Sequence, residues 1–435
     1  MESLMQYVWQ HGLWIPGDLR TVDGRRVRVI DRGLLNRDAG PDFFNAKVEI
    51  GGRLWAGNVE IHVRASDWHR HGHDADPAYS SVILHVVGRD DARISRPGGG
   101  GEIPQIVMDC APDFHSRYKE MVFGTGPLVC ASELPSVPSI YVSDWLASLA
   151  LGRLQRKAAR VRSLVDEVFE GNWRAAVYVT LARALGFGVN SDAFERLARL
   201  VPLKSLMKHS DSIDTVEGLL FGQAGLIPEP GALGEPDSLD ELYASTLRRE
   251  YAFMRLKFGI APPAAPLGWK MARMRPPNFP HRRIAALASM VVPSFELGYR
   301  IMDVASFDDA AALFSMPLRG YWSHHYSFGT PASGSPAAFG ASAINTLIIN
   351  VVAPVQYAYG EMYGHEDMMS RAVNLLDAMK PESNSIIRLF ASAGIPCRSA
   401  LESQALIELR REYCEPRKCL YCRLGHRLLA AKVKP

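Results

Sequence analysis

The sequence has little net charge and few cysteines. Its 49 lysines and arginines nearly balance 46 acidic residues, for a formal charge of +3. No global field marks the chain as a nucleic-acid-binding protein, so any such contact must come from local basic segments. Six cysteines in 435 residues, three of them between positions 414 and 422, argue against a disulfide framework and favour a metal in a reducing compartment. We therefore expect a cytoplasmic protein.

Long apolar runs are also missing. The most apolar stretch, residues 343–355, is interrupted by Asn345, Asn350 and Pro354 and is shorter than the roughly 20 residues that a bilayer requires. The first residues lack a basic segment followed by an apolar run and a cleavage site, and their spacing predicts an amphipathic helix. We predict neither a membrane span nor a leader.

The composition, 47% hydrophobic and 22% charged, is that of a globular protein that is too long for one core. Short β-like runs occupy the first 110 residues, and helical spacing dominates after residue 143. These patterns predict an α+β protein with three parts. They are a domain with a mixed sheet over residues 1–115, a mainly α-helical domain over 116–395, and a cysteine-rich metal-binding segment over 396–435.

The first part alternates strands with turn signals. After the opening helix, strands are expected at residues 25–30, 46–50 and 54–63, the last two joined at Gly51 and Gly52 as in a hairpin. Further strands are expected at 79–87 and 103–108, after a polar segment. In the second part, the Ser-, Gly- and Pro-rich residues 330–337 are expected to form a mobile loop.

Two acids and a histidine stand out in this first part. Asp42 follows Pro41, and Glu60 stands two positions before His62 on a predicted strand, so Glu60 and His62 share one face. If the hairpin folds as predicted, Asp42 and Glu60 converge on a hard cation such as Mg²⁺ or Mn²⁺. That cation would lower the pKa of a water molecule and stabilise the charge on a phosphate.

Pro41-Asp42 followed by Glu60-Ile61-His62, in the order helix, three strands, helix and strand, resembles the signature of the PD-(D/E)XK nucleases. The resemblance implies a restriction-endonuclease-like α/β core. It also implies two acids that hold Mg²⁺ and a lysine, two residues after the second acid, that orients water. Here His62 takes the place of that lysine and would position or activate water without being a permanent cation. Lys47 would supply the missing charge if it faces inward.

A histidine-rich segment follows the acidic pair. His69, His71, His73 and Asp74 are ligand-type residues within a few positions of one another, and they are candidate accessory ligands for a transition metal or contacts to phosphate. A plain solvated loop is the alternative. Likewise, Asp42 could simply cap a turn while Glu60 and His62 lie on a solvated sheet face.

The helical part contains a proline-stiffened basic segment. Arg273, Arg275, Arg282 and Arg283 lie there with a phenylalanine, and rigidly presented guanidinium groups suit phosphate oxygens while the phenyl ring suits a base. This segment is a candidate nucleic-acid contact. The alternative is that these arginines pair with acids across the helical domain.

Three closely spaced cysteines lie near the C-terminus. The spacing Cys414-x4-Cys419-x2-Cys422 is typical of zinc or iron–sulfur ligation, and either Cys397 or His426 would supply the fourth ligand. Three free thiols are the alternative. Cys110 and Cys130 are interpreted as ordinary, at least partly buried cysteines.

Over nearly its full length the chain also resembles a widespread bacterial family of unknown function, through residues 38–46, 57–62, 275–280 and 403–406. Our first hypothesis is a Mg²⁺- or Mn²⁺-dependent nuclease acting on DNA or RNA. The second is a non-catalytic nucleic-acid-binding protein on a degenerate nuclease scaffold. The third is a zinc-dependent hydrolase or regulator that uses the histidine-rich segment.

Overall fold

In this computed structural model the chain folds into two compact units. The first comprises residues 1–145, 392–395 and 409–435, and the second comprises 146–391 and 396–408. The structure describes residues 1–435 apart from 16, 37, 111, 293–294, 333–337 and 431–435. The first unit runs on to residue 145, and the predicted segment 396–435 is divided between the two units.

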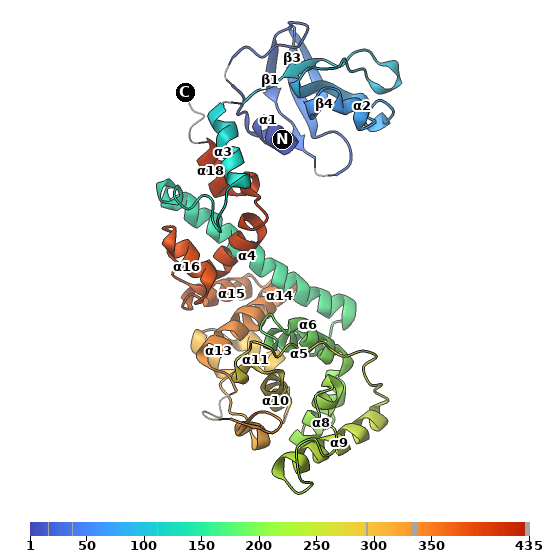
Figure 1. The fold of residues 1–435 in the computed structure, drawn as a ribbon, viewed down its shortest axis with the longest axis vertical. Helices are drawn as coiled ribbons and strands as arrows, with labels where there is room; N and C mark the ends of the chain where they lie inside the picture. Colours follow the sequence, from blue (N-terminus) through green and yellow to red (C-terminus); the bar gives the residue numbers. More distant parts are fainter. Residues whose placement is uncertain (16, 37, 111, 293–294, 333–337, 431–435) are drawn as a thin grey trace. The chain divides into compact units, whose positions relative to one another are not determined.

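The first unit is built on a six-stranded mixed sheet (Figure 1). The strand order is β1-β3-β4-β5-β6, and β2 pairs with β3 off this path. Pairing is antiparallel from β1 to β4 and parallel from β4 through β5 to β6. The strands are β1 (Val27–Asp31), β2 (Leu34–Leu35), β3 (Phe43–Ile50), β4 (Arg53–Arg64), β5 (Val82–Arg89) and β6 (Gln105–Val107). The α+β class with a mixed sheet is confirmed.

The hairpin predicted at Gly51 and Gly52 joins β3 to β4. Both glycines have positive φ, 58° and 83°, which suits a two-residue hairpin turn, and Ile50 pairs with Arg53 across it. Further along, a β-bulge between Phe43 and Ala46 contains Asn45, whose φ is 57°. The bulge shifts the register by one residue, so that Phe43 rather than Phe44 lies opposite Val59.

Short helical elements flank the sheet. Helix α1 (Glu2–His11) buries Leu4, Met5 and Val8, contacts β4, and ends at Gly12 in the left-handed conformation. Between β4 and the parallel β5, the connection holds α2 (Asp67–Arg70) and a 3₁₀ turn, η1 (Pro77–Ser81). Helix α3 (Pro112–Phe123), α18 (Arg423–Ala430), the π-helical turn η8 (Leu409–Cys414) and the 3₁₀ turns η2 (Pro97–Gly99), η3 (Leu134–Ser136) and η9 (Cys419–Tyr421) complete the described part of the unit.

The second unit is mainly helical, and its buried side chains form one large apolar core that includes Tyr178, Phe221 and Trp322. Helix α4 (Ser139–Ser163) begins in the first unit and continues into the second. The other elements are η4 (Leu164–Val168), α5 (Trp173–Leu185), α6 (Ser191–Leu200), α7 (Leu203–Met207), α8 (Ile213–Ala224), α9 (Leu239–Phe258), η5 (Pro276–Asn278), α10 (Pro280–Val291), α11 (Leu297–Asp303), α12 (Phe307–Ala312), η6 (Gly320–Ser323), β7 (His325–Ser327), β8 (Thr330–Pro331), α13 (Ala341–Leu347), η7 (Ile348–Val352), α14 (Ala353–Tyr363), α15 (Glu366–Ala378), α16 (Ser385–Ser392) and α17 (Ala400–Glu408).

One helical run in this unit is long and apolar. Among the described residues, Ala341–Tyr363 alone has the length and composition to cross a membrane, but 61% of its apolar window is buried inside the structure. Val351, Val352 and Val355 have no exposed surface. The run is therefore a core helix of the second unit, as expected from the interrupted sequence. The predicted loop at 330–337 begins with β8, and its residues 333–337 lie outside the described part of the chain.

Candidate metal centre

The acidic pair predicted from the sequence comes together in the first unit. The backbone N–H of Asp42 donates to Oε2 of Glu60 at 3.0 Å, and the N–H of Ile61 donates to Oδ2 of Asp42 at 3.0 Å. The other oxygen of Asp42 accepts from the amide of Gln6, on α1, at 2.8 Å. Asp42 and Glu60 are therefore neighbours held in a fixed relation by the end of β3 and the middle of β4.

Both carboxyl groups resist ionisation. Burial, together with the charge of Glu60, raises the pKa of Asp42 to about 7. Burial also raises the pKa of Glu60, while a hydrogen bond from His73 opposes that shift. Two carboxylates in a low-dielectric site repel each other unless a cation compensates them. The pair is thus an environment in which a bound cation would be stabilised.

A row of hydrogen bonds behind His62 sets its protonation state. The amide of Gln105 donates to Oδ1 of Asp90, which leaves Oε1 of Gln105 as the acceptor for Nδ1 of His85 at 2.8 Å. His85 is fully buried, and burial lowers its pKa to about 4, so its Nε2 carries a lone pair. That Nε2 is 2.8 Å from Nδ1 of His62, which must therefore carry the proton.

The consequence of this row is that Nε2 of His62 is unprotonated. Burial, reinforced by the neighbouring histidines, lowers the pKa of His62 to about 2, so the ring stays neutral. Its unprotonated Nε2 is in a hydrogen bond with Nδ1 of His71 at 3.2 Å and lies 3.5 Å from Oε1 of Glu60. A neutral imidazole whose other nitrogen donates to a fixed partner is the usual form of a metal-ligating histidine.

Two histidines of the predicted accessory segment complete the cluster. Ligand atoms of His62, His71 and His73 all lie within 4.8 Å of one another, and Nε2 of His73 is 3.5 Å from Oε1 of Glu60. His62 and His73 are buried whereas His71 is exposed. Three imidazoles therefore lie together, Glu60 is next to two of them, and His71 is the exposed member.

The connection between β4 and β5 holds these histidines in place. The ring of His73 stacks on Tyr79 with centroids 3.8 Å apart, and the edge of Trp68 packs against His73. Asp74 accepts from Nε1 of Trp68 at 3.1 Å and pairs with His69 at 2.7 Å. His69 and Asp74 therefore stabilise the segment and do not belong to the ligand cluster.

Lys47 does not reach this centre. It is exposed on β3, opposite Ala56 of β4, and Ala56 precedes Glu60 by four residues, or about 13 Å along a strand. The inward-facing lysine considered from the sequence is therefore not found, and the side chains next to Glu60 are those of His62 and His73.

The basic segment of the second unit divides into two pairs. Arg282 and Arg283 are buried, with Arg282 donating to the carbonyl of Trp322 and Arg283 to the carbonyl of Ala338 at 3.2 Å each. Their guanidinium groups donate to backbone carbonyls within the second unit. This corrects the expectation that they contact nucleic acid. Arg273 and Arg275 are exposed and keep the role of candidate contacts.

The predicted C-terminal ligands also separate. Cys397 lies in the second unit, where its thiol is 3.3 Å from Oγ of Ser403, whereas Cys414, Cys419 and Cys422 belong to the first unit. His426, on α18, shares a hydrogen bond with the hydroxyl of Tyr7. Both Cys397 and His426 thus have other partners in this structure, and a fourth ligand from either of them stays a prediction.

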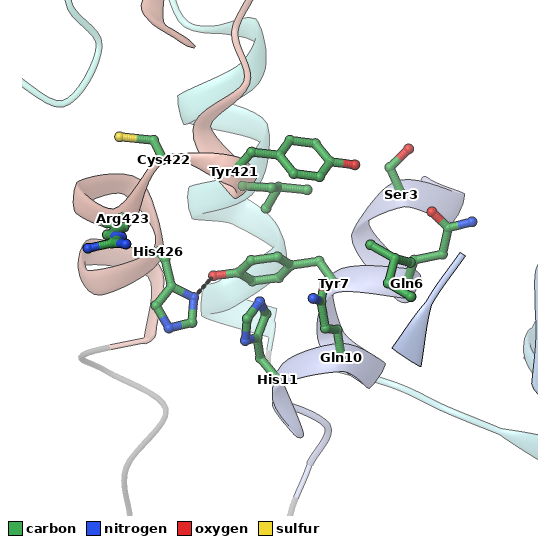
Figure 2. A pocket seen from close by; sticks show the side chains of 11 residues that line it. Ser3, Gln6, Tyr7, Gln10, His11, Tyr421, Cys422, Arg423 and His426 are labelled. Atoms are coloured by element: carbon green, nitrogen blue, oxygen red, sulfur yellow. Dashed lines mark hydrogen bonds between the residues drawn. The ribbon is translucent and has the colours of Figure 1, made fainter. Parts of the chain in front are cut away.

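His426 instead lines a cavity of about 270 Å³ in the first unit (Figure 2). Tyr7 and His11 of α1 point to the same space, and the Cys422 thiol points away from the His426 ring. Gln6 also lines the cavity while its amide donates to Asp42. The cavity thus adjoins the acidic pair through a single side chain.

A family model described as "Protein of unknown function (DUF2851)" matches residues 2–385. The chain belongs to this family. No curated protein and no solved structure matches the chain. The matched region of the DUF2851 family contains the acidic pair and the three clustered histidines and ends before Cys397. The resemblance to a family of unknown function over nearly the whole chain is thus confirmed.

The sequence predicted most members of the candidate cluster but not the residues that support them, which are Gln6, His85 and Gln105. The signal for Gln105 would have been its pairing opposite His85 in neighbouring parallel strands, because side chains directly paired in this way share a face. That pairing cannot be read from residue types alone.

Proposed function

We propose that this protein is a metal-dependent phosphodiesterase that cleaves nucleic acid at the centre in its first unit. The observation that carries the proposal is the hydrogen-bonded row behind His62. It leaves an unprotonated ring nitrogen directed at Glu60 and at His71. A neutral core histidine without a metal-binding role would not require a second buried histidine and a glutamine to fix its tautomer.

The donor set indicates which cation fits. Three imidazoles and a carboxylate suit Mn²⁺, Fe²⁺ or Zn²⁺ better than Mg²⁺, which prefers oxygen ligands. We therefore favour Mn²⁺ over the Mg²⁺ that the acidic pair alone suggested. When bound, such a cation would lower the pKa of a water molecule and stabilise the negative charge on the phosphate.

The chain's own residues would orient the reactants. Glu60 is held by the backbone N–H of Asp42, and Asp42 is held by Gln6 and Ile61. The exposed member, His71, is next to Arg70, whose guanidinium pairs with Asp67 at 3.0 Å and is largely exposed. A cationic group beside an open metal position suits an anionic substrate, and it would help to place a phosphate there.

Nucleic acid as the substrate is supported by the resemblance to PD-(D/E)XK nucleases. The first unit has a helix, an antiparallel run of β1, β3 and β4, a short helical connection and a parallel β5. The acid pair lies on adjoining strands in this order, as the motif implies. The exposed Arg273 and Arg275 of the second unit are candidate contacts for the remainder of the substrate.

The test is cleavage of labelled single- and double-stranded DNA and RNA with Mn²⁺, Zn²⁺ or Mg²⁺, by the wild type and by His71→Ala and His69→Ala. Both histidines are exposed in the same segment, but only His71 belongs to the cluster. We expect His71→Ala to lose at least about 10- to 100-fold in metal affinity or activity. His69→Ala should remain close to the wild type.

Equal activity of the two histidine variants would contradict the proposal. A folded Glu60→Gln variant that cleaves like the wild type would also contradict it. If the wild type binds nucleic acid without cleaving it, with or without added metal, the degenerate-scaffold alternative replaces it. Calorimetric titration of each variant with Mn²⁺ measures its metal affinity. The comparison with its cleavage rate separates a loss of metal binding from a loss of catalysis.

A further inference from the structure

Four thiols of the first unit are electrostatic neighbours. Burial raises the pKa of Cys414, and the thiols of Cys422, Cys130 and Cys419 add to that effect. Burial likewise raises the pKa of Cys130 to about 12, with contributions from Cys422 and Cys419. All four are free cysteines that are buried or half-buried. Cys130, more than 280 residues away in sequence, therefore lies near the C-terminal trio.

Hydrogen bonds join the two segments that carry these thiols. Arg417 donates to the carbonyls of Gly126 at 2.7 Å and Gly124 at 3.2 Å, and Arg410 donates to the carbonyl of Pro127. The thiol of Cys419 is directed at the carbonyl of Met121 at 3.6 Å. The backbone leading to Cys130 is thereby held against the segment that contains the trio, independently of any charge on the thiols.

Tight turns lie on either side of Cys419, the middle cysteine of the C-terminal trio. Arg417 has a φ of 55° in the turn after Cys414, and the N–H of Cys422 donates to the carbonyl of Cys419 at 3.3 Å. A Cβ at Gly425 would lie 2.2 Å from that same carbonyl, so only glycine lets the Cys419 turn close against α18. A residue with positive φ and a glycine therefore shape the backbone of the segment that carries the trio.

We propose that Cys130, Cys414, Cys419 and Cys422 form a soft-metal centre, taking Zn²⁺ or an iron–sulfur cluster on four thiolates. Closely spaced thiolates contributed by two segments are the usual ligands for both. Each thiol releases its proton to solvent on binding, and no change of oxidation state is needed for Zn²⁺. This centre is independent of the histidine centre and of the proposed function.

The other cysteines have different surroundings. Cys397 belongs to the second unit and contacts Ser399 and Ser403. Cys110 lies beside β6, where it forms an isolated bridge with Trp14. Cys130→Ser and Cys397→Ser are therefore a matched pair, because both thiols are half-buried but only one belongs to the proposed ligand set.

The experiment measures metal in full-length protein purified without chelator and without oxygen. Elemental analysis separates zinc from iron, and visible absorbance identifies an iron–sulfur cluster. His71→Ala is the parent chain, because this substitution should weaken metal binding at the histidine centre. We expect about one zinc or one cluster per chain, lost in Cys130→Ser and retained in Cys397→Ser.

Retention of metal in Cys130→Ser, its loss in Cys397→Ser, or its absence from the parent would overturn the proposal. Should Cys130→Ser fail to fold, alkylation of the parent chain decides the matter. The four thiols should become reactive together when a chelator is added, while the reactivity of Cys397 stays unchanged. If Cys130 already reacted with the alkylating reagent before the chelator was added, the proposal would also be overturned.

Discussion

Glu217 shows how one buried carboxyl group can link the second unit to pH. It lies on α8 and is 4% exposed. The hydroxyl of Tyr243 donates to it, and Nε1 of Trp322 donates to that hydroxyl at 2.8 Å. Burial raises the pKa of Glu217 to about 8, although the bond from Tyr243 opposes the shift. The side chain is therefore neutral in the folded unit at pH 7.

The sign of the pH effect follows from the proton count. In the unfolded chain Glu217 loses its proton near its ordinary pKa of 4.5, whereas the folded unit keeps it until about pH 8. Its stabilising contribution is present below pH 4.5 and is lost as the pH rises to about 8. We predict that Glu217→Gln removes this loss, so that at pH 9 the second unit gains about 4–5 kcal/mol over the wild type.

Denaturant unfolding at several pH values checks this prediction, with the difference in unfolding free energy between variant and wild type as the readout. Glu229→Gln, at an exposed glutamate of the same unit, is the control and should show a flat difference. A difference for Glu217→Gln that does not change between pH 5 and pH 9 would show that the carboxyl is ionised in the folded protein.

At the residue scale the sequence was informative about ligands and uninformative about protonation. Glu60, His62, His71 and His73 could be named because carboxylates and imidazoles at these spacings are ligand types. The tautomer of His62 depends on Gln105 and Asp90, which come from another strand and a loop. The burial of Arg282 is similar: its carbonyl partners belong to residues about forty positions away, so spacing gave no sign of them.

At the scale of elements, the bulge in β3 decides the candidate centre. With the register at Ala46 and Gly57 continued unbroken, Asp42 would lie opposite Ile61. The extra residue in β3 moves the partner of Asp42 to Glu60, since Phe43 lies opposite Val59. Strand positions and the hairpin turn could be predicted from alternation and from Gly51 and Gly52. The bulge could not, because Asn45 adopts its positive φ in tertiary context.

Gly57 makes the parallel pairing of β4 and β5 possible. A Cβ there would lie 2.4 Å from Cγ2 of Ile83 and 2.7 Å from the carbonyl oxygen of Ser81. We predict that Gly57→Ala destabilises the first unit by about 1–3 kcal/mol, because overpacking forces the strands apart. Displacement of Glu60, three residues along the same strand, should also weaken Mn²⁺ binding. Thermal unfolding and metal titration measure the two effects.

Gly152→Ala is the matched control. This glycine lies in α4, where the nearest atom to an added Cβ is Nη1 of Arg156 at 3.7 Å. Alanine there should stabilise the helix by about 0.5–1 kcal/mol. If Gly57→Ala were as stable as the wild type and bound Mn²⁺ equally well, the close approach of β4 and β5 at this point would be wrong.

At the scale of the whole molecule, the two units do not correspond to continuous stretches of chain. The last residues, from 409, return to the first unit, while residues 396–408 stay with the second. Composition can indicate that residue types change near position 115, but it cannot show that a C-terminal segment packs on a distant part of the chain. Composition likewise carries no sign that Cys130, a half-buried cysteine as predicted, lies near the trio.

A metal clip between Cys130 and the trio would close a loop of nearly 300 residues, and long loops gain most from such closure in chain-entropy models. We predict that removing this metal from the His71→Ala chain speeds amide hydrogen exchange at residues 121–130 and 409–422 together. Exchange in the core helices α5 and α8 of the second unit should be unchanged. Mass spectrometry of peptides before and after chelation gives the comparison, and Cys397→Ser should repeat the parent's pattern. Faster exchange at 409–422 alone would mean that the trio binds metal without Cys130, whereas faster exchange throughout α5 and α8 would mean that the metal stabilises the second unit instead.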